Sequence, residues 1–284
     1  MNKIAILVLL FSINTLAKKI GDQNYIVSPY AKVLSSESID DAKFEGIVAL
    51  SGCSGSLIVF KGQSVDDKAM ILTNDHCIYD QKPKNYILDQ PYKKTIAIYD
   101  RHRKKVSQRT TRIIYAEQTD SDFAILELGI SYQELFNKHD IVPFTLSNKK
   151  GQIDDKISII SGYWNKIYSC SIESFAFRLK ESLWVWKESY RYDCGTIGGT
   201  SGSPILLENT REVIGINNTS NERGQKCTLN NPCEIDPSGK ISIHQGKGYG
   251  QQTKYIYSCL DEKSRFDLST NGCLLYGGDS WQER

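Results

Sequence analysis

Short apolar runs recur along almost the whole chain, and they restrict the folds that it can adopt. They are rich in Ile, Val, Tyr and Trp, are bounded by Gly, Asn, Asp, Ser or Lys clusters, and cover residues 46–50, 57–60, 69–72, 95–99, 112–115, 123–126, 156–160, 175–177, 183–186, 204–207, 213–216 and 241–243. Such runs are typical of β-strands. We expect helix only near 132–138 and 256–263, so a doubly wound sheet is disfavoured. The pattern predicts an all-β protein, either a sandwich or a pair of barrels.

The first residues have the pattern of an export signal. Lys3 precedes an apolar run over 4–13, and the segment 15–17 (TLA) then supplies the small residues that a signal peptidase prefers. The run is shorter than the roughly 20 residues of a transmembrane helix, and no later segment looks membrane-spanning. We predict that 1–17 is a cleaved signal peptide, that 18–44 is an N-terminal arm or propeptide, and that the protein is secreted or periplasmic. A buried N-terminal helix is the alternative interpretation.

Composition and charge give no case for a nucleic-acid partner. Apolar residues make up 40% of the chain and charged residues 24%, as in globular proteins, and the net charge is +2. Binding to nucleic acid needs a strongly basic face. The one local basic run, 101–105, is expected to be the solvated tip of a hairpin and not a polyanion site.

Eight cysteines all follow the predicted signal, and an even number in an exported chain predicts disulfides. Cys227 and Cys233, with His244 nearby, could be taken for a metal cluster, but the paired C-x2-C spacing of structural zinc is absent. A loop closed by a disulfide is the better interpretation, and we predict no metal and no cofactor.

A glycine-rich stretch, GTIGGTSGSP at 195–204, surrounds Ser201. A serine hydroxyl is a weak nucleophile at neutral pH, so it needs an adjacent base and a third group that orients the base. Of the four histidines, His76 stands at the end of an apolar strand, whereas the others lie in the basic run, after a polar stretch and in a late strand. Cys53, 24 residues before Cys77, could form a disulfide that fixes the loop bearing His76. Ser201 and His76 are therefore candidates for a nucleophile and its base.

Three segments resemble motifs of the trypsin/chymotrypsin-like serine proteases, the S1-type family of the PA clan. CSGSLI (53–58) followed by LTNDHC (72–77) resembles the CGGSLI…TAAHC pattern, and SDFAIL (121–126) resembles the strand that carries the triad aspartate. TSGSP (200–204) resembles the nucleophile motif, in the GNSGSP form of glutamyl-endopeptidase-like bacterial members. The motifs follow the family's His…Asp…Ser order, 46 and then 79 residues apart.

The resemblance extends over about 45–258 and implies two antiparallel six-stranded β-barrels with a short C-terminal helix. The first barrel would lie at about 45–140 and the second at about 141–258, with a disulfide-closed tail over 259–284. It also favours four disulfides, although sequence alone does not fix their connectivity: Cys53–Cys77, Cys170–Cys194, Cys227–Cys233 and Cys259–Cys273.

The same resemblance implies catalytic roles. Ser201 would attack a scissile carbonyl, His76 would take its proton, and Asp122 would orient the imidazole. The backbone N–H groups of Gly199 and Ser201 would form an oxyanion hole. Asp120 is the rival for the acid, and Asp122 is preferred because Phe-Ala-Ile-Leu follows it directly, as in the family motif.

The primary specificity pocket is expected to be lined by Gly195, Thr196, Asn217 and Asn218. Gly195 stands where trypsin-like members have an acidic residue, so the usual determinant of Lys/Arg preference is missing. Thr196 matches the threonine of glutamyl-specific members, but Asn217 replaces their histidine. The primary cleavage preference therefore does not follow from these residues. Thr200, in place of the aspartate of animal digestive members, indicates that their activation switch is absent.

Two rival classes were weighed against this interpretation. An α/β-hydrolase would need glycine two residues after its nucleophile, where Ser203 stands, and the order Ser…Asp…His. A catalytically silent binding protein on the same scaffold would be favoured if Trp184 and Trp186, or the loop 221–240, blocked the cleft. We expect the two tryptophans to cover a hydrophobic face and not to serve as a stacking platform. We predict a monomeric, exported serine endopeptidase that acts on proteins or peptides.

Overall fold

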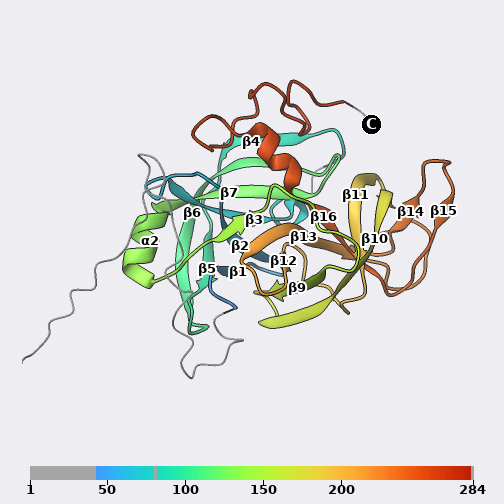
Figure 1. The fold of residues 1–284 in the computed structure, drawn as a ribbon, viewed down its shortest axis with the longest axis horizontal. Helices are drawn as coiled ribbons and strands as arrows, with labels where there is room; N and C mark the ends of the chain where they lie inside the picture. Colours follow the sequence, from blue (N-terminus) through green and yellow to red (C-terminus); the bar gives the residue numbers. More distant parts are fainter. Residues whose placement is uncertain (1–42, 80–81, 283–284) are drawn as a thin grey trace, which may run out of the picture.

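The computed structural model describes residues 43–79 and 82–282 (Figure 1). The predicted signal peptide and all but the end of the predicted arm lie outside the described residues. Strands dominate the described part of the chain, in which the one α-helix is α2 (Tyr132–His139). None of its helices has the length and hydropathy needed to cross a membrane.

The first barrel is a closed ring of six antiparallel strands. In ring order they are β1 (Ile47–Ala49), β5 (Thr95–Tyr99), β6 (Lys105–Glu117), β7 (Phe123–Ser131), β3 (Lys68–Thr73) and β2 (Ser54–Val59), which pairs with β1 again. Aliphatic side chains fill the interior, among them Leu57, Ile71, Ile98, Ile113 and Leu126. Strand β4 (Tyr86–Pro91) pairs with β6 outside the ring. Burial of these β-branched and aliphatic residues explains why the short apolar runs fold as strands.

The second barrel closes in the same way. Its ring runs through β9 (Lys156–Ser161), β10 (Lys166–Glu181), β11 (Trp184–Tyr192), β16 (Gly248–Gln252), β13 (Glu212–Ser220) and β12 (Pro204–Leu207). Its core combines tyrosines with aliphatic residues, among them Tyr190, Tyr192, Ile159, Ile205 and Ile214. The predicted pair of six-stranded barrels is therefore confirmed. A hairpin of β14 (Cys233–Ile235) and β15 (Ile241–Ser242) extends the second barrel from β10.

A short strand joins the two barrels. β8 (Phe144–Leu146) runs parallel to both β2 and β13, one strand from each barrel. Nearby, the Ser54 N–H donates to the Ser201 carbonyl at 2.8 Å, and the hydroxyls of Ser54 and Ser161 are 3.0 Å apart. A shared hydrophobic cluster, with Phe123 and Ile160 among its members, lies between the barrels. The barrels consequently lie side by side as one body (Figure 1).

After β16 the chain forms the 3₁₀ helix η2 (Lys254–Cys259) and then a tail that, as far as residue 282, has no further strand. The predicted C-terminal helix is thus present, but it is a 3₁₀ helix that begins and ends earlier than expected. The tail contributes the buried side chains of Leu268 and Leu275 to the shared cluster. In Figure 1 this segment, drawn in red, covers one side of the molecule next to β4.

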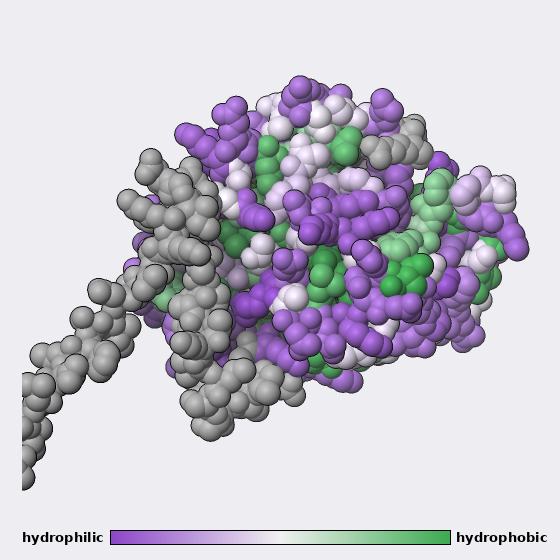
Figure 2. Space-filling view, viewed as in Figure 1, coloured by the Kyte–Doolittle hydropathy of each residue, from purple (hydrophilic) through white to green (hydrophobic). Residues whose placement is uncertain are grey.

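The four predicted disulfides are all present: Cys53–Cys77, Cys170–Cys194, Cys227–Cys233 and Cys259–Cys273. The predicted hairpin tip is also found, since the basic run 101–105 turns between β5 and β6. On the face drawn in Figure 2, hydrophobic residues form small patches between hydrophilic ones. This mixed surface is usual for a globular protein.

Candidate active site

His76 and Asp122 form a close pair on the first barrel. His76 lies in the 3₁₀ helix η1 (Asp75–Cys77), directly after β3, and the disulfide of Cys77 ties this turn to Cys53. The imidazole Nδ1 is 2.6 Å from Oδ2 of Asp122, whose side chain is only 1% exposed. The other carboxylate oxygen accepts the backbone N–H groups of Asp75 at 2.8 Å and His76 at 3.3 Å. These bonds fix both the carboxylate and the orientation of the ring.

The environment of His76 favours its charged form. Burial by itself lowers the pKa of the imidazole, because it penalises the cation. The carboxylate of Asp122 counteracts this through its charge and its hydrogen bond, and Glu181 and Asp75 add to it, so the pKa of His76 is raised above the ordinary value of 6.5. An imidazolium formed at this position is consequently stabilised.

Asp120, the rival acid, makes different contacts. Its carboxylate oxygen Oδ2 is 2.7 Å from Nζ of Lys187 and accepts the indole N–H of Trp281 at 2.6 Å. Asp122, and not Asp120, is therefore the aspartate that contacts His76.

Ser201 lies in a turn between the barrels. Its hydroxyl donates a hydrogen bond to the carbonyl of Asn218 at 3.1 Å, the one hydrogen bond that this hydroxyl makes with the described residues. His76 and Ser201 nevertheless line the same cleft, which has a volume of about 330 Å³. Catalytic hydrogen bonds are often long or misaligned in ligand-free structures. A rotation of the Ser201 hydroxyl about its side-chain bond would redirect it within this cleft.

Two glycines beside Ser201 need backbone conformations that other residues rarely adopt. Gly199 and Gly202 have φ angles of +88° and +77°. A Cβ at Gly202 would lie 2.2 Å from the Ser54 carbonyl oxygen and 2.3 Å from the Thr73 hydroxyl oxygen. Within the described part of the chain, the N–H groups of Gly199 and Ser201 donate no hydrogen bond, whereas that of Thr200 donates to a carbonyl in the same turn. Neither N–H group expected for the oxyanion hole has an acceptor among the described residues; Ser201 lines the cleft, whereas Gly199 is not among the residues that line it.

The cleft contains three of the four predicted specificity residues. Thr196, Asn217 and Asn218 line it, whereas Gly195 does not. Asn217 is held in place from both sides: its Oδ1 accepts from the Tyr192 hydroxyl at 2.8 Å and its Nδ2 donates to the Thr200 hydroxyl at 3.0 Å. Asn217 is therefore a fixed wall beside the serine turn.

The tryptophan pair belongs both to a core and to the cleft. Trp186 is buried against Ala176, Leu179 and Tyr249, with Trp184 packed beside them, which confirms that the pair covers a hydrophobic face. Both indoles also line the cleft. Because the cleft retains its volume beside them, they form its wall and do not fill it.

Other cleft residues were not predicted from the sequence. They come from β10, from the segment before Asp122 and from the loop 221–240, and they are Gln118, Glu181, Glu222, Leu229 and Asn230. Glu181 is 4% exposed and accepts the Asn230 N–H at 2.8 Å. Burial raises the pKa of its carboxyl group, although the Thr219 hydroxyl and the Asn230 N–H act in the opposite direction. No local sequence signal places these residues here, because separate loops bring them together.

One group of three possible metal ligands occurs among the described residues, and it consists of Cys53, His76 and Cys77. Both cysteine sulfurs belong to the same disulfide. A disulfide lacks the thiolate that binds zinc, so this group does not have the chemistry of a zinc site.

Comparison with known proteins assigns the family. Residues 53–216, more than half of the chain, match the trypsin-like peptidase domain family, and the chain belongs to this family. No curated protein matches the chain.

The chain also aligns with solved structures. The protease domain of MamO from Magnetospirillum magneticum is 12% identical, with a TM-score of 0.51 over 78% of this chain and 98% of that chain. The serine endoprotease from Yersinia pestis is 14% identical, with a TM-score of 0.43 over 78% of this chain and 64% of that chain. The family and the two barrels together define a trypsin-like protease scaffold.

Proposed function

We propose that the protein is an exported serine endopeptidase that hydrolyses peptide bonds through an acyl-enzyme intermediate. The observation that carries this proposal is the contact of 2.6 Å between His76 and the buried Asp122, at the edge of a cleft that Ser201 also lines. Membership of the trypsin-like peptidase family supports it. Four disulfides support export into an oxidising compartment, outside the cell or in the periplasm.

In the first step, the Ser201 oxygen forms a bond to the scissile carbonyl carbon while its proton passes to Nε2 of His76. The Asp122 carboxylate accepts the Nδ1–H of the ring, which leaves Nε2 free to take the proton. The carbonyl oxygen becomes an oxyanion, and the free N–H groups of Gly199 and Ser201 are the donors that would stabilise it.

In the second step, His76 gives its proton to the leaving amine as the C–N bond breaks, and an acyl ester on Ser201 remains. Water then attacks the ester, again with His76 as the base, and the acid product leaves with the serine restored. The open volume between His76 and the walls of Asn217, Trp184 and Trp186 is where the substrate chain would bind.

Fluorophosphonate labelling of protein without residues 1–17, read by intact mass, tests the proposal. We expect one label per molecule, no label on Ser201→Ala or His76→Ala, and full labelling of Ser238→Ala, a control on an exposed turn. If the unvaried protein remains unlabelled even after removal of 18–42, the endopeptidase proposal fails.

The second candidate is a binding protein without catalysis. The bond from the Ser201 hydroxyl to the Asn218 carbonyl favours it, because the hydroxyl proton is donated to this carbonyl and not to the imidazole. Unlabelled protein that still binds peptides in the cleft would support this candidate.

A further inference from the structure

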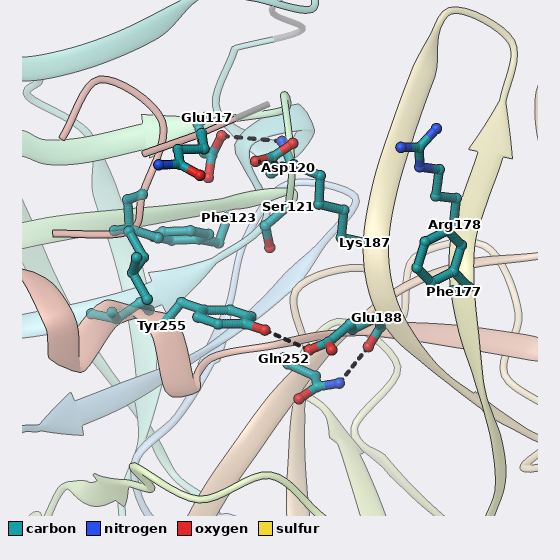
Figure 3. A pocket seen from close by; sticks show the side chains of 14 residues that line it. Glu117, Asp120, Ser121, Phe123, Phe177, Arg178, Lys187, Glu188, Gln252 and Tyr255 are labelled. Carbon is teal, nitrogen blue, oxygen red and sulfur yellow. Dashed lines mark hydrogen bonds and ion pairs between the residues drawn. The ribbon is translucent and has the colours of Figure 1, made fainter. Parts of the chain in front are cut away.

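Asp120 connects three separate parts of the molecule. Its N–H donates to Oε2 of buried Glu117 at 3.3 Å within the first barrel, and its carbonyl accepts the Lys187 N–H of β11 at 3.0 Å. Its carboxylate binds Lys187 Nζ at 2.7 Å and the Trp281 indole N–H at 2.6 Å. Figure 3 shows Glu117, Asp120 and Ser121 on one side of a small cavity, with Lys187 and Glu188 of β11 facing them.

These contacts join the barrels immediately beside the triad acid. Asp120 is two residues before Asp122, and Lys187 is on a strand of the second barrel, which also carries Ser201. The distance between His76 and Ser201 depends on how one barrel sits against the other. A bond between the barrels at Asp120 therefore constrains the geometry that proton transfer needs.

The tail holds Trp281 at this position. The disulfide Cys259–Cys273 anchors the tail to η2, and the Tyr115 hydroxyl donates to the Tyr276 carbonyl at 2.7 Å. The Trp281 ring packs edge-on against Tyr276, with ring centroids 4.7 Å apart. Asp120 and Lys187 are both largely shielded from solvent, with exposed side-chain fractions of 23% and 19%. Partial burial makes such a contact stronger than an ordinary surface ion pair.

We propose that Asp120 is a positioning residue and that the tail, through Trp281, is part of the peptidase machinery. Asp120, Lys187 and Trp281 form a clamp that fixes Asp122 and the relative position of the barrels. The inference rests on the proposed function, since the clamp acts on the geometry of His76, Asp122 and Ser201. Asp120 and Lys187 lie within the residues that match the family, whereas Trp281 lies beyond them.

The test compares Trp281→Phe with Ser264→Ala. The first keeps an aromatic ring but removes the N–H that Asp120 accepts. The second removes a tail bond outside the clamp, from the Ser264 hydroxyl to the Lys61 carbonyl at 3.0 Å. We expect Trp281→Phe and Asp120→Asn to slow fluorophosphonate labelling on the order of tenfold, because small displacements of catalytic groups are costly. Ser264→Ala should stay within about twofold of the unvaried protein, because it leaves the clamp contacts in place.

A second readout does not depend on catalysis. The low-field proton NMR signal of the His76 Nδ1–H reports its bond to Asp122, and it should shift or broaden in Trp281→Phe but not in Ser264→Ala. If Trp281→Phe labels at the unvaried rate and keeps this signal, the clamp proposal is overturned. If no form of the protein is labelled, the proposed function fails, and the NMR signal alone decides whether the clamp holds Asp122.

Discussion

Two buried carboxyl groups near the cleft, those of Asp122 and Glu117, have different hydrogen-bond partners. Asp122 accepts two backbone N–H groups and contacts His76, so it has the partners that a buried anion requires. Glu117 is also completely buried, but its Oε1 has no hydrogen-bond partner among the described residues. Burial and the neighbouring charge of Asp120 raise the pKa of Glu117 to about 8. The carboxyl group of Glu117 therefore keeps its proton at neutral pH.

The raised pKa of His76 predicts the acid limb of the pH profile. The base must be neutral to accept the Ser201 proton, so the acylation rate should fall as the pH decreases, with a midpoint above 6.5. Asp122→Asn should lower this midpoint and reduce the rate by roughly 10⁴-fold, because it removes the charge and disturbs the tautomer. Acylation rates measured between pH 5 and 9 would check this. A midpoint that does not move in Asp122→Asn would contradict the electrostatic account.

The raised pKa of Glu117 predicts that the protein becomes less stable as the pH rises, whereas a carboxylate in an ordinary ion pair loses stability as the pH falls. Its carboxyl group keeps its proton up to about pH 8 when folded but loses it near 4.5 when unfolded. Unfolding therefore releases a proton between these values, and the free energy of unfolding falls with rising pH by at most about 1.4 kcal/mol per pH unit.

We expect Glu117→Gln to remove this dependence. Its melting temperature should exceed that of the unvaried protein at pH 8 by more than it does at pH 5. Calorimetry at both pH values measures the difference. An equal difference at the two values would show that Glu117 does not titrate in this range.

At the scale of elements, the turn around Ser201 depends on the absence of a side chain at Gly202. We expect Gly202→Ala to lower the free energy of unfolding by about 2 kcal/mol or more and to abolish labelling, because of the positive φ and the overlap with Ser54. Gly198→Ala is the matched stability control, since an added Cβ there has no neighbour within 4 Å. Urea denaturation of both variants measures the two free energies of unfolding. Equal losses in Gly202→Ala and Gly198→Ala would contradict the expectation.

The two long-range disulfides of the barrels offer a matched pair of variants. Cys53–Cys77 and Cys170–Cys194 both join cysteines 24 residues apart. Replacing either pair by serines should lower the free energy of unfolding by about 3 kcal/mol. Only the loss of Cys53–Cys77 should also change the His76 pKa, because this bond holds η1. NMR titration of His76 in both variants distinguishes the cases, and equal pKa changes would count against this role.

Strands were predicted best where their buried positions are occupied by a run of apolar residues. β5 has alternating buried positions, and the residues 95–99 that it occupies were predicted as they stand. β16, with the sequence GYGQQ, is fully buried yet contains two glycines and two glutamines, so its composition argues against a strand. Its place is set by pairing with β11 and β13, which a local pattern does not reveal.

At the scale of the whole molecule, the site residues also divide into those that a local motif predicts and those that only distant contacts bring together. His76, Asp122 and Ser201 were predicted because each stands in a short motif with a known order. Glu181 and Trp281 had no such motif, since each contributes only through contacts with residues far away in the chain. Gly195 was expected in the pocket from its place in the motif, but it does not line the cleft.

The contact between β2 and the serine turn has a consequence for folding. The Ser54 N–H holds the Ser201 carbonyl, and the Ser54 carbonyl oxygen occupies the space that Gly202 leaves empty. The turn is therefore shaped in part by the other barrel. On the proposed mechanism, a molecule with only one barrel folded has no competent nucleophile, so nascent chains are protected from digesting one another before both barrels have formed.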